Sequence, residues 1–201
     1  MDSGRRVERK IVYIMKADDR AQNIGNYQTR FERFVKGLKM DGFEVFGYAR
    51  KSPHKLSSEA LKKNLQNMIT CLRHRSLVEA VYVSPNSLAK SPIVSRDMSN
   101  TDEELVQMEL DNCAGSTQTL LAYLSSTEKK VCLIIVDYAA LSTKSADVLA
   151  LVKNHKSLEY IVVDRLKETG RYEVYRRIEI LQTSDCLDSF DYRKGFPHRS
   201  I

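Results

Sequence analysis

The 201-residue sequence lacks the short motifs that mark the most common nucleotide-binding and hydrolytic sites. Gly47 has no glycine partner at the spacing of a P-loop or of a dinucleotide-binding loop, so neither type of phosphate cradle is expected. No Gly-x-Ser-x-Gly sequence is present either, which argues against the nucleophile elbow of the α/β-hydrolases. A phosphate or a nucleophilic serine would therefore have to be held in some other way.

Cysteine and histidine are scarce and widely spaced. They occupy positions Cys71, Cys113, Cys132, Cys186, His54, His74, His155 and His198. There is no Cys-x-x-Cys pair, and no histidine lies at ligand spacing from a cysteine or from another histidine, so we expect no bound metal. Scattered cysteines, two of them within apolar segments, fit a protein of a reduced intracellular compartment, and the nucleus is left open as its location.

Long apolar segments are absent as well. No run approaches the length of a membrane span, and residues 1–10 are not followed by an apolar region ending in small residues, so neither a membrane anchor nor a signal peptide is expected. The chain is nonetheless 42% apolar and 29% charged, a composition that supports a folded core rather than disorder.

Charge is distributed unevenly along the chain. Its net value of +6 is modest and does not by itself demand a nucleic acid partner. Residues 50–75 contain seven basic residues and Glu59 as the one acidic residue, an excess that equals the net charge, whereas residues 101–112 contain five acidic residues and no basic one. Two interpretations stay open: two solvated helix faces that pair with each other, or an anion-facing edge between Arg50 and Arg75.

Apolar periodicity predicts strands that alternate with helices. The predicted strands cover residues 10–15, 43–49, 78–84, 131–136 and 158–163. The predicted helices cover residues 27–38, 57–75, 101–110, 114–126 and 143–155. Residues 23–26 are expected to break the chain, 85–100 to form a loop and 186–201 a tail, while 171–181 fits a β-ribbon and a helix equally well.

This alternation predicts an α/β fold. We expect a mostly parallel sheet of about five strands, with right-handed crossovers and helices on both faces. Residues 1–42 would form a βα prefix packed on the main unit of residues 43–165, and residues 166–201 an extension and tail, all within one domain.

The carboxyl ends of the predicted strands are where ligands bind in such sheets. The second strand ends at Tyr48–Ser52 (YARKS), the third leads towards Arg96, and the fourth ends at Asp137. A serine beside two cations and before a helix could engage a phosphate. The simpler alternatives are that Ser52 only helps to cap helix 57–75, that Asp137 caps helix 143–155 or pairs with a nearby cation, and that Tyr48 is only a core aromatic.

The segment Tyr48–Ser52 resembles the Y-x-R-x-S motif that opens the catalytic domain of serine recombinases, the resolvase and invertase family. The order of elements is similar too: a helix, a strand, a polar loop with an arginine, a helical region, and an apolar strand followed by an aspartate. In this chain these are helix 57–75, strand 78–84, Arg96 and Asp137, so the resemblance covers roughly residues 43–165 and implies a resolvase-like fold.

The resemblance implies a specific chemistry. A serine hydroxyl attacks a DNA phosphodiester and forms a 5′-phosphoserine link, arginines stabilise the charge that develops on the phosphorus, and no metal or other cofactor is needed. Position by position, Ser52 matches the nucleophile, Arg50 the motif arginine and Asp137 the aspartate, while Arg96 matches the loop arginine. The residues expected to bind nucleic acid are Lys51, Lys55, Lys62, Lys63, Arg73 and Arg75.

The sequence also departs from the family pattern. The two arginines expected after Asp137 are replaced by Tyr138 and by Ala140 or Leu141, and no helix-turn-helix domain is recognisable outside residues 43–165. We therefore expect a recombinase-derived domain that associates with DNA and has weak or lost strand-transfer activity. Two alternatives stay open: a non-catalytic α/β protein-interaction module, and an active recombinase or transposase. A second copy of the chain or another protein is also left open as a partner.

Overall fold

The computed structural model describes residues 17–53, 57–99, 101–165 and 171–191. The strand predicted at residues 10–15 lies outside these ranges, and so do Lys55 and the end of the predicted tail.

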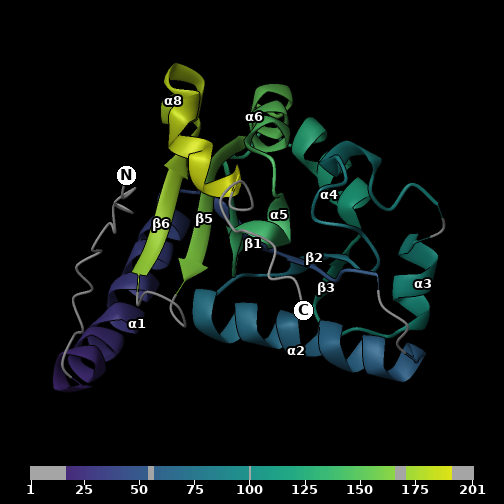
Figure 1. Ribbon diagram of the computed structural model, residues 1–201, viewed down its shortest axis with the longest axis horizontal. Helices are drawn as coiled ribbons and strands as arrows, with labels where there is room; N and C mark the ends of the chain where they lie inside the picture. The colour runs from purple at the N-terminus through teal and green to yellow at the C-terminus, as the bar shows by residue number, and fades with distance from the viewer. Residues whose placement is uncertain (1–16, 54–56, 100, 166–170, 192–201) are drawn as a thin grey trace, which may run out of the picture.

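The centre of the molecule is a six-stranded sheet (Figure 1). Its strands are β1 (Glu44–Arg50), β2 (Val81–Ser84), β3 (Cys113–Gly115), β4 (Val131–Ile135), β5 (Leu158–Arg165) and β6 (Arg171–Arg176). They follow the order β3-β2-β1-β4-β5-β6; the first five are mutually parallel, and β6 pairs with β5 in the antiparallel sense. The prediction of a mostly parallel α/β sheet is confirmed.

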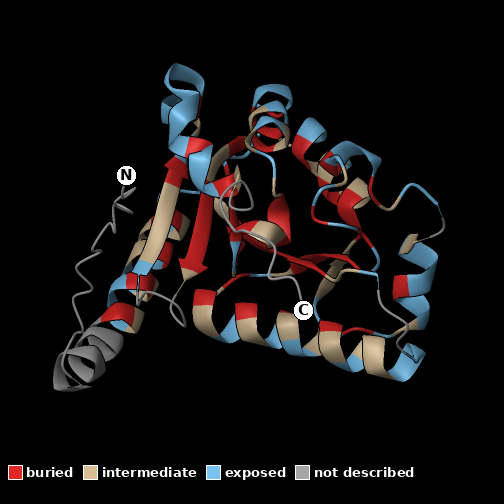
Figure 2. Cartoon of the chain, in the orientation of Figure 1, coloured by how far each residue is buried: buried red, intermediate tan, exposed pale blue. Residues whose placement is uncertain are grey.

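Helices cover both faces of this sheet (Figure 1). They are α1 (Ala17–Met40), α2 (Ser58–Ser76), α3 (Thr101–Gln107), α4 (Thr117–Ser126), α5 (Tyr138–Leu141), α6 (Ser145–Asn154) and α8 (Arg177–Gln182), with 3-10 turns η1 (Ile93–Ser95) and η2 (Ser184–Asp191). Apolar side chains of α1 and α2 pack on one face, and those of α4, α6, α8 and η2 pack on the other. Figure 2 shows the strands buried between these layers.

The central strands are apolar because both of their faces are covered. All five residues of β4 are buried, as are six of the seven in β1, which fits strands enclosed by helices on either side. Gly47 in β1 serves packing: a Cβ there would lie 3.0 Å from a Val81 methyl carbon and 3.1 Å from a Leu72 methyl carbon. The absent side chain lets α2 lie close against the sheet.

Several boundaries differ from those predicted. Helix α1 starts at Ala17, so the chain break predicted at 23–26 is wrong; extending a helix costs less than nucleating one, and the packed part after Tyr27 supports its earlier turns. The ambiguous segment 171–181 contains both elements, strand β6 followed by α8. The predicted tail is wrong for η2, because Leu187 and Phe190 are fully buried against the core.

Candidate functional site

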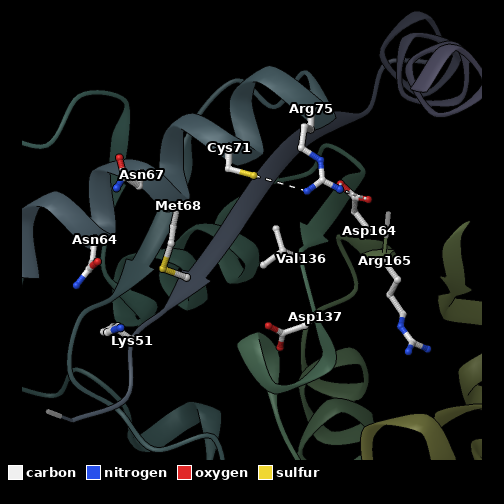
Figure 3. A pocket seen from close by; sticks show the side chains of 10 residues that line it. All are labelled: Lys51, Asn64, Asn67, Met68, Cys71, Arg75, Val136, Asp137, Asp164 and Arg165. Atoms are coloured by element: carbon white, nitrogen blue, oxygen red, sulfur yellow. Dashed lines mark hydrogen bonds and ion pairs between the residues drawn. The ribbon is translucent and has the colours of Figure 1, made fainter. Parts of the chain in front are cut away.

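The site lies at the carboxyl ends of the parallel strands, called here the carboxyl edge of the sheet. At this edge the chain leaves two neighbouring strands, β1 and β4, in opposite directions. From β1 it passes through α2 on one face, and from β4 it passes through α5 and α6 on the other. Such a reversal opens a crevice beyond the strand ends. A cavity of about 430 Å³ is present there (Figure 3). Its lining residues are Lys51, Asn64, Asn67, Met68, Cys71, Arg75, Val136, Asp137, Asp164 and Arg165.

Arg50 and Ser52 of the YARKS segment are in direct contact at the end of β1. The Nη1 atom of Arg50 donates a hydrogen bond to Ser52 Oγ at 3.0 Å and a second to the carbonyl of Ser87, while its Nε atom donates to the carbonyl of Ala139 at 2.9 Å. Arg50 is 9% exposed, and Ser52 is partly exposed. The guanidinium thus joins the ends of β1, β2 and β4 and holds the serine hydroxyl beside a fixed positive charge.

Arg96 is placed differently from Arg50. It is 1% exposed, and its guanidinium donates to the carbonyls of Leu141 at 2.7 Å, Ala89 at 3.2 Å and Ser91 at 2.9 Å. A further bond of 3.2 Å goes to the hydroxyl of Tyr48. None of its described hydrogen bonds reaches Ser52, so Arg96 organises the loop after β2 rather than the serine. Tyr48 is a core aromatic, as one alternative had it, and its hydroxyl is part of this network as well.

Asp137 stands at the end of β4, inside the cavity lining. Its Oδ1 atom accepts a hydrogen bond of 2.7 Å from the backbone N–H of Ala140, so the carboxylate caps α5. The alternative that it caps the helix predicted at 143–155 is wrong, because that helix, α6, follows Lys144 without a side-chain cap. The Asp137 side chain is exposed and faces the cavity, where its negative charge is accessible to a ligand (Figure 3).

Tyr138, which stands where the recombinase pattern has an arginine, turns into the core. Its hydroxyl donates to the carboxylate of Glu173 and lies 3.0 Å from the hydroxyl of Tyr175. Arg165 of β5 lies over the Tyr138 ring, 5.3 Å from its centre, and its Nη1 atom is 3.3 Å from Glu173 Oε1. Burial opposes ionisation of Glu173, but the tyrosine hydrogen bonds and Arg165 outweigh it and lower the pKa of this carboxyl. Arg165 is thus one of the lining residues of the cavity, but its guanidinium points away from the cavity towards Tyr138 and Glu173 (Figure 3).

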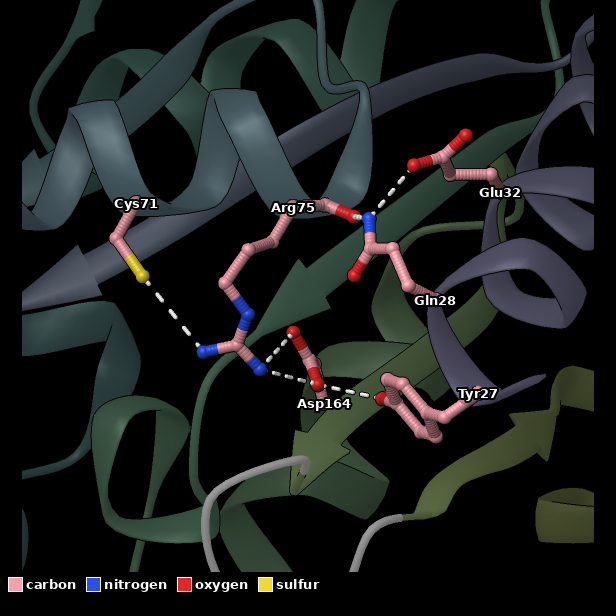
Figure 4. A network of polar contacts seen from close by, with 6 residues as sticks. All are labelled: Tyr27, Gln28, Glu32, Cys71, Arg75 and Asp164. Carbon is pink, nitrogen blue, oxygen red and sulfur yellow. Dashed lines mark hydrogen bonds and ion pairs between the residues drawn. The ribbon is translucent and has the colours of Figure 1, made fainter. Parts of the chain in front are cut away.

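A buried charge network closes the far end of the cavity (Figure 4). Arg75 Nη2 lies 2.7 Å from both carboxylate oxygens of Asp164, which is 2% exposed, and the hydroxyl of Tyr27 donates to the same carboxylate. Burial and the neighbouring Asp164 charge both raise the pKa of the Tyr27 hydroxyl, which stays protonated as the donor. The network joins α1, α2 and β5, so Arg75 is committed to the interior.

The other basic residues of segment 50–75 divide between the two interpretations of its charge. Lys62 pairs with Glu109 at 3.7 Å, so the basic and acidic segments do meet at one exposed ion pair. Lys63 and Arg73 are exposed on α2, and Lys51 lines the cavity. The sequence prediction did not include Asp164 and Arg165; the available signal was a charged pair directly after the apolar stretch YIVV of β5.

Searches for a metal cluster, for a membrane-spanning helix and for similar proteins each gave a negative result. Within the described ranges, no three His, Cys, Asp or Glu side chains lie close enough to hold a metal ion. None of the described helices combines the length and apolar character needed to cross a bilayer. No protein-family model, curated protein or solved structure matches the chain.

Proposed function

We propose that the chain is a serine-recombinase-derived α/β domain that binds DNA at the carboxyl edge of its sheet and has weak or lost strand-transfer activity. The observation that carries the proposal is the 3.0 Å hydrogen bond from Arg50 to Ser52 Oγ at the end of β1. A hydroxyl beside a fixed guanidinium is suited to contact a phosphate oxygen, because the phosphate charge is compensated where it binds. The proposed partner is DNA, in a reduced intracellular compartment.

The order of elements around this contact supports the proposal. The YARKS segment is followed by α2, β2, a polar loop with Arg96, a helical region and the apolar strand β4, which leads into Asp137. Lys51 lies beside the serine on the cavity side, and Lys63 and Arg73 remain exposed on α2. These three positive charges are available to the backbone of a nucleic acid.

Three side chains support weak or lost chemistry. The described hydrogen bonds of Arg96 end on carbonyls and on Tyr48, Tyr138 is directed into the core, and Asp137 is engaged as a helix cap. Losing one donor that stabilises the charge of a transition state typically costs about 10²–10³ in rate. The hydrogen bonds from Arg96 to carbonyls also favour the alternative of a non-catalytic protein-interaction module, because an arginine bonded to carbonyls stabilises the fold.

Two measurements test the proposal on the full chain. Binding of a labelled duplex is expected to weaken about 100-fold between roughly 50 and 200 mM salt, the dependence of about four phosphate contacts. A nicked suicide substrate is expected to trap little or no covalent adduct, in wild type as in Ser52→Ala. Absent or salt-insensitive binding would reject DNA association and favour the interaction module. An abundant adduct lost in Ser52→Ala would instead establish an active recombinase.

The exposed charge of Asp137 gives a separate prediction. The variant Asp137→Asn is expected to bind DNA about fivefold more tightly at low salt, because the repulsion between two unit charges about 4 Å apart in water is about 1 kcal/mol. Asparagine caps helices about as well as aspartate, so thermal stability should change little. The charge-matched control is Glu128→Gln, an exposed residue just before β4 at the opposite end of the sheet. Equal affinities for Asp137→Asn and wild type would exclude contact at this edge.

A further inference from the structure

We infer that the groove between helix α3 and the outer edge of strand β3 binds an extended peptide in which Lys or Arg residues flank apolar side chains. The groove shares no lining residue with the cavity at the ends of β1 and β4, so the inference does not depend on the proposed DNA association. It assigns a partner class to the acidic segment 101–112, which the proposed function leaves without a role.

The groove is apolar at its base. It has a volume of about 390 Å³, and the residues that line it come from α3 and the turn after it, from β3 and from α4. Leu105 and Leu110 are almost fully buried there, and Cys113 and Ala114 of β3 are half-buried. Val106 of α3 lines the same groove and is 76% exposed. This valine leaves apolar surface in water beside an apolar groove, which a partner can cover.

Asp102, near the start of α3, holds the groove in shape. Its carboxylate accepts hydrogen bonds from the backbone N–H of Ser116 at 2.7 Å and from the hydroxyl of Thr119 at 2.9 Å. These bonds fix α3 to the turn between β3 and α4. Gly115 permits the close approach of this turn to α4, because a Cβ at its φ of +132° would lie 2.8 Å from Thr119. A groove that is already formed needs little ordering when a partner binds, which lowers the entropic cost.

The edge of β3 offers backbone groups along this groove. β3 pairs with β2 on one side, and no strand of the described ranges pairs with its other side. Figure 1 shows α3 beside this end of the sheet. An unpaired strand edge is a template for a further strand, and several peptide-binding domains add their ligand in that way. Because β3 has three residues, its backbone can hold a short stretch of peptide, and side-chain contacts must supply the rest.

The charge around the groove selects a basic partner. Residues 101–112 carry five acidic side chains and no basic one. Glu103 and Glu104 are exposed on α3, and the Glu109 side chain, which lines the groove, is 84% exposed. Glu109 pairs with Lys62 at 3.7 Å, but exposed ion pairs of this kind contribute little, so an incoming cation can replace Lys62. Complementary charge accelerates association and discriminates against acidic partners.

An extended peptide fits this surface better than a nucleic acid or a helix does. The exposed carboxylates of segment 101–112 would repel the phosphates of a nucleic acid. A helix would leave the edge of β3 unpaired, because its backbone groups already bond to one another. A peptide strand satisfies that edge and places apolar side chains at the groove and basic ones beside the carboxylates.

The experiment titrates labelled peptides of sequence KRVKVKR, KRLKLKR and KRIKIKR into the full chain and follows fluorescence anisotropy. Val106→Ser should weaken binding of the tightest peptide about tenfold, because a valine that is covered on binding stabilises the complex. Glu109→Lys should weaken it at least tenfold, because attraction to the peptide becomes repulsion. The matched controls are Ile178→Ser, an exposed apolar residue of α8, and Glu128→Lys, an exposed residue before β4. Both should bind as wild type.

Methylation of single peptide amides tests the strand pairing. In a paired strand, alternate N–H groups point towards the neighbouring strand. Methylation of a central amide that bonds to β3 should therefore weaken binding about fivefold, whereas methylation of the adjacent amide should have little effect. A peptide in which Ser replaces both apolar residues should also bind about tenfold more weakly.

Several outcomes would overturn the inference. Failure of all three peptides to bind wild type, or equal loss in a groove variant and its control, would exclude the groove. Equal effects of methylation at adjacent amides would exclude an added strand. Self-association of wild type that Glu109→Lys abolishes would make a second copy the occupant instead of a peptide. DNA binding should be the same in Val106→Ser as in wild type, and its absence from both would reject the proposed function alone.

Discussion

Replacing Asp164 with alanine is expected to lower the free energy of unfolding by about 3–5 kcal/mol, the usual cost of removing one partner of a buried ion pair. The Asp164 side chain is 1% exposed and that of Arg75 is 18% exposed, so the variant would leave a largely buried guanidinium without its carboxylate. It would also deprive the buried Tyr27 hydroxyl of its acceptor. Because these three residues come from β5, α2 and α1, their separation should loosen both helices from the sheet.

Chemical denaturation measures this effect, and the exposed Lys62–Glu109 pair offers a control. Glu109→Ala should change stability by no more than about 1 kcal/mol, as is typical of surface ion pairs. Removing both charges at the buried site, as in Arg75→Met with Asp164→Leu, should recover much of the lost stability, because no uncompensated charge remains. A loss below about 1 kcal/mol in Asp164→Ala would show that the pair contributes little.

The second large effect is expected at Arg96. Replacing it with alanine should lower the free energy of unfolding by about 3–5 kcal/mol, because buried carbonyls lose charged donors and a cavity opens. The carbonyls concerned belong to Ala89, Ser91 and Leu141, so the loss would loosen the loop after β2 and the end of α5 together.

The same denaturation experiment tests the structural role of Arg96 against a role in DNA binding. The exposed neighbour Lys90 is the control, and Lys90→Ala should stay within about 0.5 kcal/mol of wild type. If Arg96→Ala kept wild-type stability but lost salt-dependent DNA binding, Arg96 would have to be a phosphate ligand.

The long apolar elements could be predicted from the sequence because burial on two faces leaves a direct trace in composition. β4 is an uninterrupted apolar run, and β1 and β5 contain the uncharged stretches VFGYA and YIVV between charged residues. Helix α2 has apolar residues at three- and four-residue spacing and a serine N-cap at Ser57, whose side chain accepts from the N–H of Ala60.

The short elements could not be predicted, because tertiary contacts define them. β3 has three residues and exists as a strand through its pairing with β2, and α5 is a single turn capped by Asp137. The turn η2 follows the same rule, since Leu187 and Phe190 become core residues once α6 and α8 are in place.

The candidate site was partly predictable as well. Residues two apart in an extended segment point to the same face of a sheet, and the pairing of Arg50 with Ser52 agrees with that. Local sequence does not reveal which way an arginine points: Arg75 and Arg96 look as solvated as Lys63, yet both are held inside the molecule. Arg165 was missed for the same reason, because the direction of its guanidinium is set by Glu173 of β6 and by the Tyr138 ring, which are distant from it in the sequence.

The place of β1 in the sheet has a consequence for how the molecule folds. Its two neighbours are β2, close in sequence, and β4, whose pairing joins Glu44 to Val131 and Gly47 to Ile134. Closing so long a loop carries an entropic cost before any contact rewards it, which slows folding. The Arg50–Ser52 pair also relies on the carbonyl of Ala139, beyond β4. During synthesis the site can therefore assemble only after the chain has grown past β4, so nascent chains emerge without it.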